Sequence, residues 1–354
     1  MRILSIDTSC DETAVAVTAN LQVVSNIVWS QSSLHSSFGG VFPSLAQRQH
    51  QERIDWVISK ALAKANCRLS SVDCIAVTVG KGLAIALSVG VNKAKELARE
   101  HNKPLVPISH IEAHLLSPFA RPNSKVTSNV SAIFPAFGLV LSGGTTILCL
   151  IKNIGEYEIL AETSDDALGE ALDKGARLLG LGYPGGAILE KFARLGTPDK
   201  NKLPLPLQND KTKDRFSYSG LKTAFLRLVE SVKNPSKQDI YDLSASFQST
   251  AFDHIEKVLE YQIRNSKIKV QNLLFGGGVA NNIEIKKRLR KLCKKHKIKL
   301  LVPYNKKLNG DNAGMVGVCA YLKNKGLNTK KLITKYGGLE NINSVDINPR
   351  LKIE

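Results

Sequence analysis

Paired cysteines are missing from this sequence. Its six cysteines are scattered, and none lies in a CxxC pair of the kind that builds zinc ribbons or redox dithiols. We therefore expect reduced thiols in a cytosolic protein. The positions are Cys10, Cys67, Cys74, Cys149, Cys293 and Cys319.

Long apolar segments are missing as well. The opening residues, MRILSIDTSCDE, carry an acid by position seven and hold no apolar core or small-residue cleavage site, so we expect no secretion signal. No apolar run approaches the roughly 20 residues of a membrane-spanning helix. The expectation is a cytoplasmic protein with no membrane partner.

Acidic residues are in deficit. The 49 Lys and Arg residues outnumber 31 Asp and Glu residues, which gives a formal net charge of +18. Such a balance favours a polyanionic partner, with nucleic acid first and an acidic membrane surface second. A lysine-rich solvated surface is the alternative.

The densest basic segment is residues 286–299, with nine Lys and Arg residues. As a helix with Ile285, Leu289 and Leu292 inward, it would present a basic outer face suited to backbone phosphates. No aromatic residues interleave with the charges, so base stacking is not indicated. A solvated helix face is an equal alternative.

The chain contains a repeated pattern. A strand, a turn of small polar residues and two further strands occur near the start and again after residue 136. With 354 residues, the chain is long enough for two domains. The pattern predicts an α/β fold with two similar lobes and a cleft between them. The predicted strands are 2–6, 14–18 and 23–29, then 137–141, 147–152 and 157–162.

The predicted boundaries follow from this repeat. We expect a first lobe over 1–120, completed by a helix near 311–330, a second lobe over 130–310 and a tail over 331–354. Residues 196–220 are rich in Pro, Lys and Asp and predict an insertion, whereas 121–131 predict a polar segment of low order. Helices are expected at 51–65, 88–101, 167–179, 240–264, 284–296 and 313–325.

The stretch Ser109-His110-Ile111-Glu112-Ala113-His114 follows an apolar run. If a helix starts here, the two histidines lie on one face and can bind one divalent metal. Glu112 would point away from them, unlike the glutamate of HExxH metalloproteases. Histidines that only cap or line a helix are the alternative.

Three glycine-containing or hydroxyl-rich turns follow predicted strands, at 7–9, 142–146 and 276–282. Each offers approachable backbone N–H groups for a phosphate, and Asp7 adds a carboxylate that could orient a metal or a proton. A single turn of this kind is more often structural, but three in two lobes favour a nucleotide cleft. Two further acids stand out: Asp173, and Asp311, for which spacing alone favours a helix N-cap over a metal ligand.

Eight motifs in order carry a resemblance to a known family. They resemble the TsaD family of tRNA threonylcarbamoyladenosine synthases, in its bacterial branch, from Met1 to about Lys325. The motifs are SIDTSCDETAVAV, GGVFPSLAQRQHQERI, SHIEAH, LVLSGGTT, GEALDKGARLLGLGYPGG, FSYSGLK, FGGGVANN and GDNAGMVG.

The resemblance implies two RNase H-like lobes of the actin, Hsp70 and sugar-kinase superfamily. It implies an acyltransferase that moves the threonylcarbamoyl group of threonylcarbamoyl-AMP to N6 of the adenosine 3′ of the anticodon, in tRNAs reading ANN codons. It also implies a small TsaB-like paralogue and a TsaE-like ATPase as partners.

The resemblance also assigns residues. His110, His114 and Asp311 match the ligands of one divalent metal per chain, iron(II) or alternatively zinc(II). Asp11 and Glu12 fall on a motif at the cleft, and we expect them to take part in proton transfer. The positions that match adenylate binding are Val140, Leu141, Ser142, Gly143, Gly144, Asp173, Gly186 and Asn282.

Two positions depart from the family pattern. Thr145 replaces a histidine after the paired glycines, and Lys81 replaces the proline of a GPGL turn. Thr145 would preserve a hydrogen bond to phosphate, and Lys81 would add a cation near the cleft or face solvent. Altered substrate handling at these two turns is a consequence to test.

Other functions remain open from the sequence. A metalloprotease would need a general base that Glu112 does not supply. A small-molecule kinase of the same superfamily would use the glycine turns for ATP and would not need His110. A non-catalytic subunit would bind tRNA through the basic helix.

Overall fold

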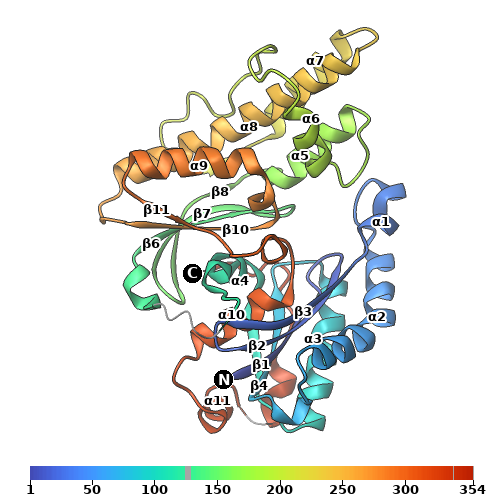
Figure 1. Cartoon of the computed structure of the whole chain (residues 1–354), viewed down its shortest axis with the longest axis vertical. Coiled ribbons are helices and arrows are strands. Elements are labelled where there is room, and N and C mark those ends of the chain that lie inside the picture. Colours follow the sequence, from blue (N-terminus) through green and yellow to red (C-terminus); the bar gives the residue numbers. More distant parts are fainter. Residues whose placement is uncertain (124–128, 338, 354) are drawn as a thin grey trace. The chain divides into compact units, whose positions relative to one another are not determined.

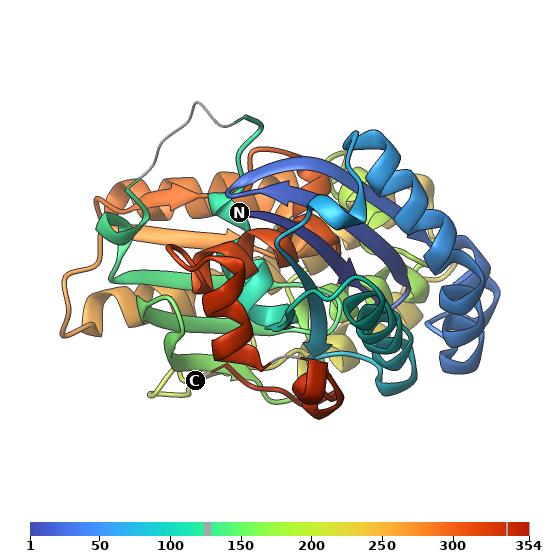
Figure 2. The same cartoon turned by 90° about the horizontal axis from the view of Figure 1, so that it is seen from below.

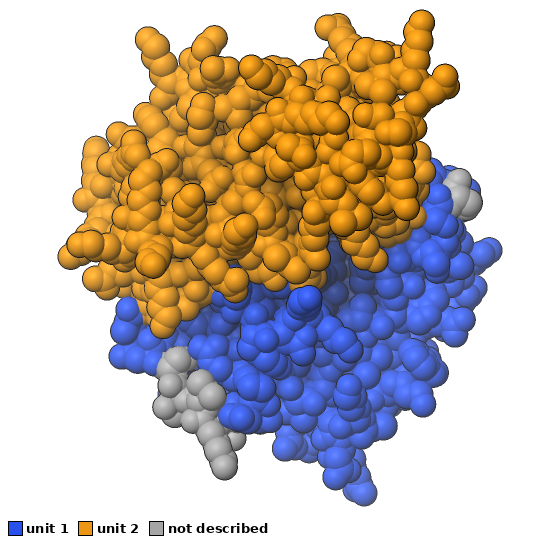
Figure 3. All heavy atoms as spheres, turned by 45° about the horizontal axis from the view of Figure 1, so that its top comes forward, with its two compact units in different colours: residues 1–132, 154–156, 302–354 blue, residues 133–153, 157–301 orange. Residues whose placement is uncertain are grey.

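The computed structural model describes residues 1–123, 129–337 and 339–353, which form two compact units. Unit 1 comprises residues 1–132, 154–156 and 302–354, and unit 2 comprises residues 133–153 and 157–301 (Figure 3). Unit 1 is thus built from segments far apart in the sequence. The predicted polar segment 121–131 falls partly outside the described residues.

Unit 1 contains a mixed five-stranded sheet. Its strand order is β3-β2-β1-β4-β5, with β1 antiparallel to β2 and parallel to β4, which is parallel to β5. The carboxyl ends of β1, β4 and β5 therefore lie at one edge of the sheet. The strands are β1 (Arg2–Asp7), β2 (Glu12–Ala19), β3 (Gln22–Ser30), β4 (Cys74–Gly80) and β5 (Leu105–Ser109).

Helices cover both faces of this sheet, as alternation along β1 requires. Helices α2 (Pro43–Lys64) and α3 (Ala84–Glu100) lie against the sheet (Figure 2). Leu4 and Ile6 belong to the apolar core on that side. Ser5 points the other way, where its hydroxyl donates to the carbonyl of Ala313 at 2.7 Å. Ala313 begins α10 (Ala313–Lys323), which also packs against α4 (His110–Leu116).

Unit 2 repeats the topology. Its sheet order is β11-β10-β6-β7-β8-β9, so β8-β7-β6-β10-β11 corresponds to the five strands of unit 1 (Figure 1). β6 is antiparallel to β7 and parallel to β10. The strands are β6 (Ala136–Leu141), β7 (Thr146–Asn153), β8 (Glu156–Thr163), β9 (Arg215–Phe216), β10 (Asn272–Gly276) and β11 (Lys299–Leu301).

Helical segments complete both units. The helices of unit 2 are α5 (Leu168–Leu178), α6 (Gly186–Ala193), α7 (Ser219–Ser231), α8 (Lys237–Asn265) and α9 (Ile283–Lys295). Unit 1 also holds α1 (Ser32–His35) and α11 (Thr329–Tyr336). Short 3-10 turns lie at Ser36–Phe38, Leu69–Ser71, Ser117–Phe119, Val130–Ile133, Gly278–Asn281, Lys306–Leu308 and Leu339–Ser344.

Some sequence predictions of single elements were wrong. The helix expected at 51–65 begins eight residues earlier, because Pro43 occupies its first turn and the polar residues that follow carry no apolar period. Four helices of the described residues, α1, α6, α7 and α11, were not predicted. Leu221 and Phe225, which are four residues apart and buried in α7, are the signal that was available.

Candidate metal centre and substrate site

His110 and His114 lie side by side on α4. Strand β5 ends at Ser109, whose hydroxyl accepts the backbone N–H of Glu112 at 3.5 Å and caps the helix. Because α4 begins at His110, the next histidine lies one turn later on the same face. The two ring centroids are 4.6 Å apart, and both rings are buried. The predicted pairing of the histidines is confirmed.

Asp311 joins the two histidines from a distant part of the chain. Its Oδ1 lies 3.0 Å from Nε2 of His114 and 3.5 Å from Nε2 of His110. The cap of α10 is the next residue, Asn312, whose side chain accepts the N–H of Met315 at 3.1 Å. The alternative of Asp311 as an N-cap is therefore wrong, and its carboxylate is available for another role.

The three side chains suit a divalent cation. Their ligand atoms all lie within 4.8 Å of one another. Two imidazoles and one carboxylate form a donor set that iron and zinc accept, and three protein ligands leave positions open for substrate. The residues present therefore fit the metal that the resemblance implies.

The pKa values of the three side chains depend on one another. Burial lowers the pKa of His110, but the carboxylates of Asp311 and Asp7 outweigh burial and raise it to about 10. Burial alone would raise the pKa of Asp311, yet His110 and His114 hold it well below its usual range. Burial lowers the pKa of His114. A bound cation would take the place of the proton that the cluster otherwise holds.

Glu112 points away from the two histidines. Its Oε2 accepts a hydrogen bond from Nζ of Lys323 on α10 at 2.6 Å, and its side chain is 3% exposed. The predicted orientation is confirmed. A glutamate held in a buried ion pair on the opposite face of α4 is not the general base of a metalloprotease.

Asp11 and Glu12 lie where the turn after β1 leads into β2. Burial, Asp11 and Asp311 all raise the pKa of Glu12 well above its usual range, although Oε1 accepts a hydrogen bond from Ser30 at 3.1 Å. A carboxyl group with a raised pKa can carry a proton near neutral pH.

The turn after β6 is open at its glycines. Val140 and Leu141 are fully buried in the strand, and the N–H of Ser142 donates to the carbonyl of Thr145 at 2.8 Å. A Cβ added to Gly143 or Gly144 would meet no protein atom. Packing within the protein therefore does not require these glycines, whereas close approach of a ligand to the backbone would.

Asp173 and Gly186 are brought together. Oδ1 of Asp173, on α5, accepts the N–H groups of Gly185 at 2.9 Å and Gly186 at 2.7 Å. The carboxylate thereby holds the first residues of α6. Asp173 shapes the backbone around Gly186 as well as standing at a predicted binding position.

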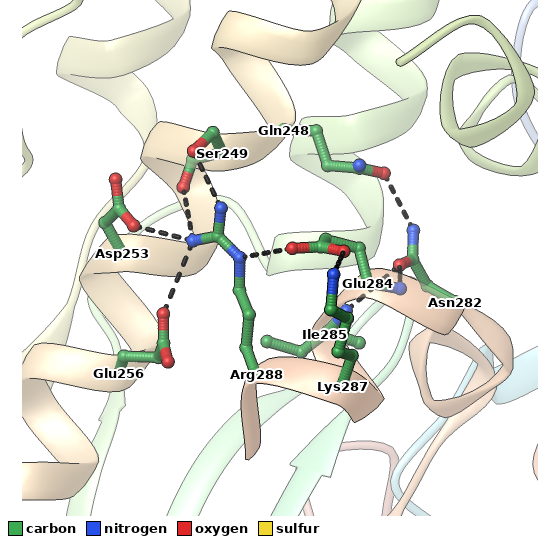
Figure 4. Close-up of polar contacts among 9 residues, drawn as sticks. All are labelled: Gln248, Ser249, Asp253, Glu256, Asn282, Glu284, Ile285, Lys287 and Arg288. Carbon is green, nitrogen blue, oxygen red and sulfur yellow. Dashed lines mark hydrogen bonds and ion pairs between the residues drawn. The ribbon is translucent and has the colours of Figure 1, made fainter. Parts of the chain in front are cut away.

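Asn282 lies after β10, whose carboxyl end is adjacent to that of β6. Its Oδ1 caps α9 by accepting the N–H groups of Glu284 and Ile285, and its Nδ2 donates to Oε1 of Gln248 at 2.8 Å (Figure 4). Sequence reasoning missed Gln248, which lies inside α8 and belongs to none of the eight motifs. An acceptor for the Asn282 amide could be found only once α8 and α9 were seen to pack together.

The basic residues of α9 divide into two groups. Arg288 faces α8, where its guanidinium contacts Glu284, Asp253 and Glu256 and both oxygens of Ser249 (Figure 4). Among the described residues, Arg290 and Lys294 form no ion pair, and both are exposed. The predicted inward side chains Ile285, Leu289 and Leu292 are buried. The predicted amphipathic helix is confirmed.

The two departures from the family pattern lie in different settings. Thr145 is 5% exposed and its carbonyl closes the Ser142 turn, so its side chain sits within a packed turn. Lys81 is half-buried directly after β4. None of the helices in the described part of the chain combines the length and apolar character that a bilayer crossing requires.

Known structures share this fold. Component A of (R)-2-hydroxyglutaryl-CoA dehydratase from Acidaminococcus fermentans matches with a TM-score of 0.53 at 14% identity, covering 94% of this chain and 99% of that one. A full-length HypF structure matches with a TM-score of 0.55 at 14% identity, covering 92% of this chain and 55% of that one. The chain has the actin, Hsp70 and sugar-kinase type of α/β fold, as predicted.

Sequence comparison identifies the family within that class. The model of the TsaD family, tRNA N6-adenosine threonylcarbamoyltransferase, matches residues 22–318. A protein of that name from Trichlorobacter lovleyi is 44% identical over 326 residues, covering 91% of this chain and 92% of its own length. One from Persephonella marina is 40% identical, covering 92% and 91%. The chain belongs to the TsaD family.

Proposed function

We propose that this chain transfers a threonylcarbamoyl group from threonylcarbamoyl-AMP to N6 of the adenosine 3′ of the anticodon in tRNAs that read ANN codons. The observation that carries the proposal is the meeting of His110, His114 and Asp311 in a chain that belongs to the TsaD family. His114 and Asp311 are 197 positions apart in the sequence, yet their side chains lie 3.0 Å apart.

The reaction replaces the C–O bond at the carbamoyl carbon by a C–N bond. N6 of adenosine attacks the carbamoyl carbon of the mixed anhydride, a C–N bond forms, the C–O bond to phosphate breaks, and AMP leaves with that electron pair. The N6 group gives up one proton. Because the anhydride is already activated, the protein mainly orients the reactants and offsets charge.

The chain's own residues supply these tasks. The turn at Gly143 and Gly144 lets phosphate oxygens of the adenylate approach the backbone, and Asp173, Gly186 and Asn282 shape the rest of that binding surface. Glu12, with its raised pKa, takes up or relays the proton released from N6, with Asp11 beside it. His110, His114 and Asp311 would hold a divalent metal, iron(II) first and zinc(II) second, which when bound supplies Lewis-acid stabilisation of substrate oxygens.

Partners and location complete the proposal. The net charge of +18 suits tRNA as substrate, and the exposed Arg290 and Lys294 suit its backbone. Family membership supports a TsaB-like paralogue and a TsaE-like ATPase as helpers in the cytoplasm. Exposed aromatic side chains on unit 1, with Phe38 stacked on Phe42 at 5.1 Å, offer a surface for such a helper.

The test is transfer of labelled threonine from enzymatically made threonylcarbamoyl-AMP to an ANN-decoding tRNA transcript, with bacterial partner proteins present. Wild type and His101→Ala, which removes a surface histidine 31% exposed at its side chain, should both incorporate label. His110→Ala should not.

Two results would favour the rivals. Absence of incorporation by wild type, with partners shown to be competent, would refute the transferase and favour a non-catalytic tRNA-binding subunit. ATP-dependent phosphorylation of a small molecule that survives His110→Ala would favour a kinase of the same fold.

A further inference from the structure

Two buried polar atoms face each other beside the candidate metal centre. Nδ1 of His110 and Oδ2 of Asp7 lie 3.5 Å apart, and the side chain of Asp7 is 1% exposed. Within the described residues, each of these two atoms lacks a hydrogen-bond partner. A buried polar group without a partner is costly, so an arrangement that leaves two of them face to face calls for an explanation.

The sheet of unit 1 brings these residues together. Asp7 is the last residue of β1, and His110 follows β5 directly. Both strands run parallel to β4, so their carboxyl ends lie at the same edge. Oδ1 of Asp7 accepts the N–H of Ser9 at 3.1 Å, which fixes the carboxylate and leaves Oδ2 directed at the imidazole.

The position of Asp7 relative to the ring separates its role from that of a ligand. Nε2 of His110 lies near Asp311, on the side where the three candidate ligands converge. Nδ1, on the other side of the same ring, lies near Asp7. The two nitrogens of a neutral imidazole have opposite roles, one carrying the proton and the other free to bind a metal.

We propose that Asp7 is the positioning carboxylate of His110, accepting the Nδ1–H so that Nε2 is left unprotonated for the metal. The inference rests on the proposed metal site and deepens it. A ligating histidine commonly gives its second N–H to a carboxylate or carbonyl, which fixes the ring and strengthens it as a ligand. Asp7 completes an arrangement of carboxylate, histidine and metal without touching the metal.

Zinc affinity of the Asp7→Asn variant tests this role. The substitution keeps the volume of the side chain and removes its charge. Competition with a chromophoric chelator should show zinc binding about 10-fold to 100-fold weaker than in wild type. Ser9→Ala is the matched control, because its hydroxyl is also buried without a partner in the described residues while its backbone N–H still serves Asp7. Its zinc affinity should stay within about twofold of wild type, since it removes no group of the proposed arrangement.

A second readout separates positioning from general damage to the fold. The chain has only seven histidines, so the imidazole ¹⁵N signals of the zinc-loaded protein can be assigned. In wild type, His110 should show a protonated Nδ1 and a zinc-bound Nε2. In Asp7→Asn, the signals of His110 should shift toward the other tautomer or broaden, with those of His101 unchanged.

The outcomes are distinguishable. If Asp7→Asn binds zinc as tightly as wild type while His110→Ala does not, the positioning role is refuted and the metal site stands. If His110→Ala also binds zinc like wild type, the metal site itself is refuted. Should Asp7→Asn fail to fold by circular dichroism, Asp7→Glu is used instead. Retention of zinc with a protonated Nδ1 in that variant supports the proposal, and a mixture of tautomers overturns it.

Discussion

Lys323 on α10 donates a hydrogen bond of 2.6 Å to Glu112, which lies on α4 between the two candidate metal ligands. Burial lowers the pKa of Lys323, but the carboxylate of Glu112 outweighs burial and raises it. The pair fastens the helix that carries His110 and His114 to the helix that directly follows Asp311. It therefore holds together the two elements beside which the candidate metal ligands lie.

Removing Lys323 should lower the free energy of unfolding. Lys323→Met removes the cation that pairs with the buried carboxylate of Glu112, which costs about 3 to 5 kcal/mol of unfolding free energy. The double variant Glu112→Leu/Lys323→Met should recover much of that loss, because no buried charge remains at the position of this ion pair. Urea denaturation of wild type, both single variants and the double variant measures the coupling. Additive losses would show that the two side chains do not interact.

Metal removal should lower thermal stability. A ligand that binds only the folded chain stabilises it, by about 2.7 kcal/mol at a free concentration one hundred times its Kd. Wild type with added zinc should melt at a higher temperature than after chelation, and His114→Ala should show no such difference. His101→Ala should behave as wild type. An unchanged melting temperature on chelation of wild type would contradict a site at this cluster.

His254 should make unit 2 sensitive to acid. Burial lowers its pKa to about 4, with Lys213 adding to the effect, and its Nε2 accepts the N–H of Ser217 at 3.3 Å. The unfolded chain, with an ordinary histidine, binds this proton at higher pH than the folded chain does. The contribution of neutral His254 to the free energy of unfolding is therefore fully present above about pH 6.5. It falls as the pH drops toward 4, by up to about 3 kcal/mol.

The variant His254→Gln isolates that effect, since glutamine can accept the same N–H but does not titrate. Urea unfolding at several values between pH 4.5 and 7.5 should give a shallower dependence in the variant than in wild type. If the free energy of unfolding depends on pH equally in the two proteins, other groups account for the acid sensitivity.

Asn282 should show separable structural and binding roles. Asn282→Ala removes the cap of α9 and should cost about 1 kcal/mol of unfolding free energy. Asn282→Asp keeps the capping oxygen, loses the donor to Gln248 and adds a negative charge that the N-terminus of α9 favours, so its loss of stability should be smaller. Under the proposed function, both variants should weaken AMP binding measured by calorimetry. Unaltered AMP affinity in both would restrict Asn282 to its cap.

The outer face of α9 should contribute to tRNA binding. Lys291 and Lys295 line a groove of about 980 Å³ together with Asp253, Glu256 and Glu260, so they are poor candidates for phosphate contacts. Arg290 and Lys294 are exposed and, among the described residues, form no ion pair. Arg290→Ala/Lys294→Ala should weaken binding and reduce the slope of log affinity against log salt by about 1.4 to 1.8, for two lost phosphate contacts.

A matched double variant, Lys60→Ala/Lys64→Ala, removes the same charge from α2 of unit 1. Filter binding across a range of salt concentrations should leave its slope close to wild type. Equal reductions in both double variants would assign the effect to net charge alone, and no reduction in the first would exclude the α9 face.

The sequence predicts the repeated strand topology of the two units. It also predicts that His110 and His114 lie on one face of a helix. The alternation along the first strands and the four-residue spacing of His110 and His114 are local patterns, and local patterns survive in the fold. Pairings between distant residues are different in kind. Neither Gln248 with Asn282 nor Lys323 with Glu112 follows from any local period, because each depends on how two helices pack.

Asp311 illustrates the limit most clearly. From spacing alone it looks like the cap of the following helix, because an acid just before an apolar run is typical of that position. The cap is instead its neighbour Asn312, and the choice between the two is made by backbone geometry that no single-sequence pattern records. The family motif supplied what local reasoning could not.

The interrupted course of unit 1 has a consequence for biosynthesis. Residues 1–132 leave the ribosome early, but Asp311 and α10, which contacts Ser5 and Glu112, emerge only after the whole of unit 2. At about 10 residues per second, roughly 20 seconds separate His114 from Asp311. During that interval the two histidines have no carboxylate from Asp311 to meet, so the nascent chain cannot close a three-ligand site around a metal. At the proposed site, a metal can therefore meet all three ligands only in chains translated past residue 311.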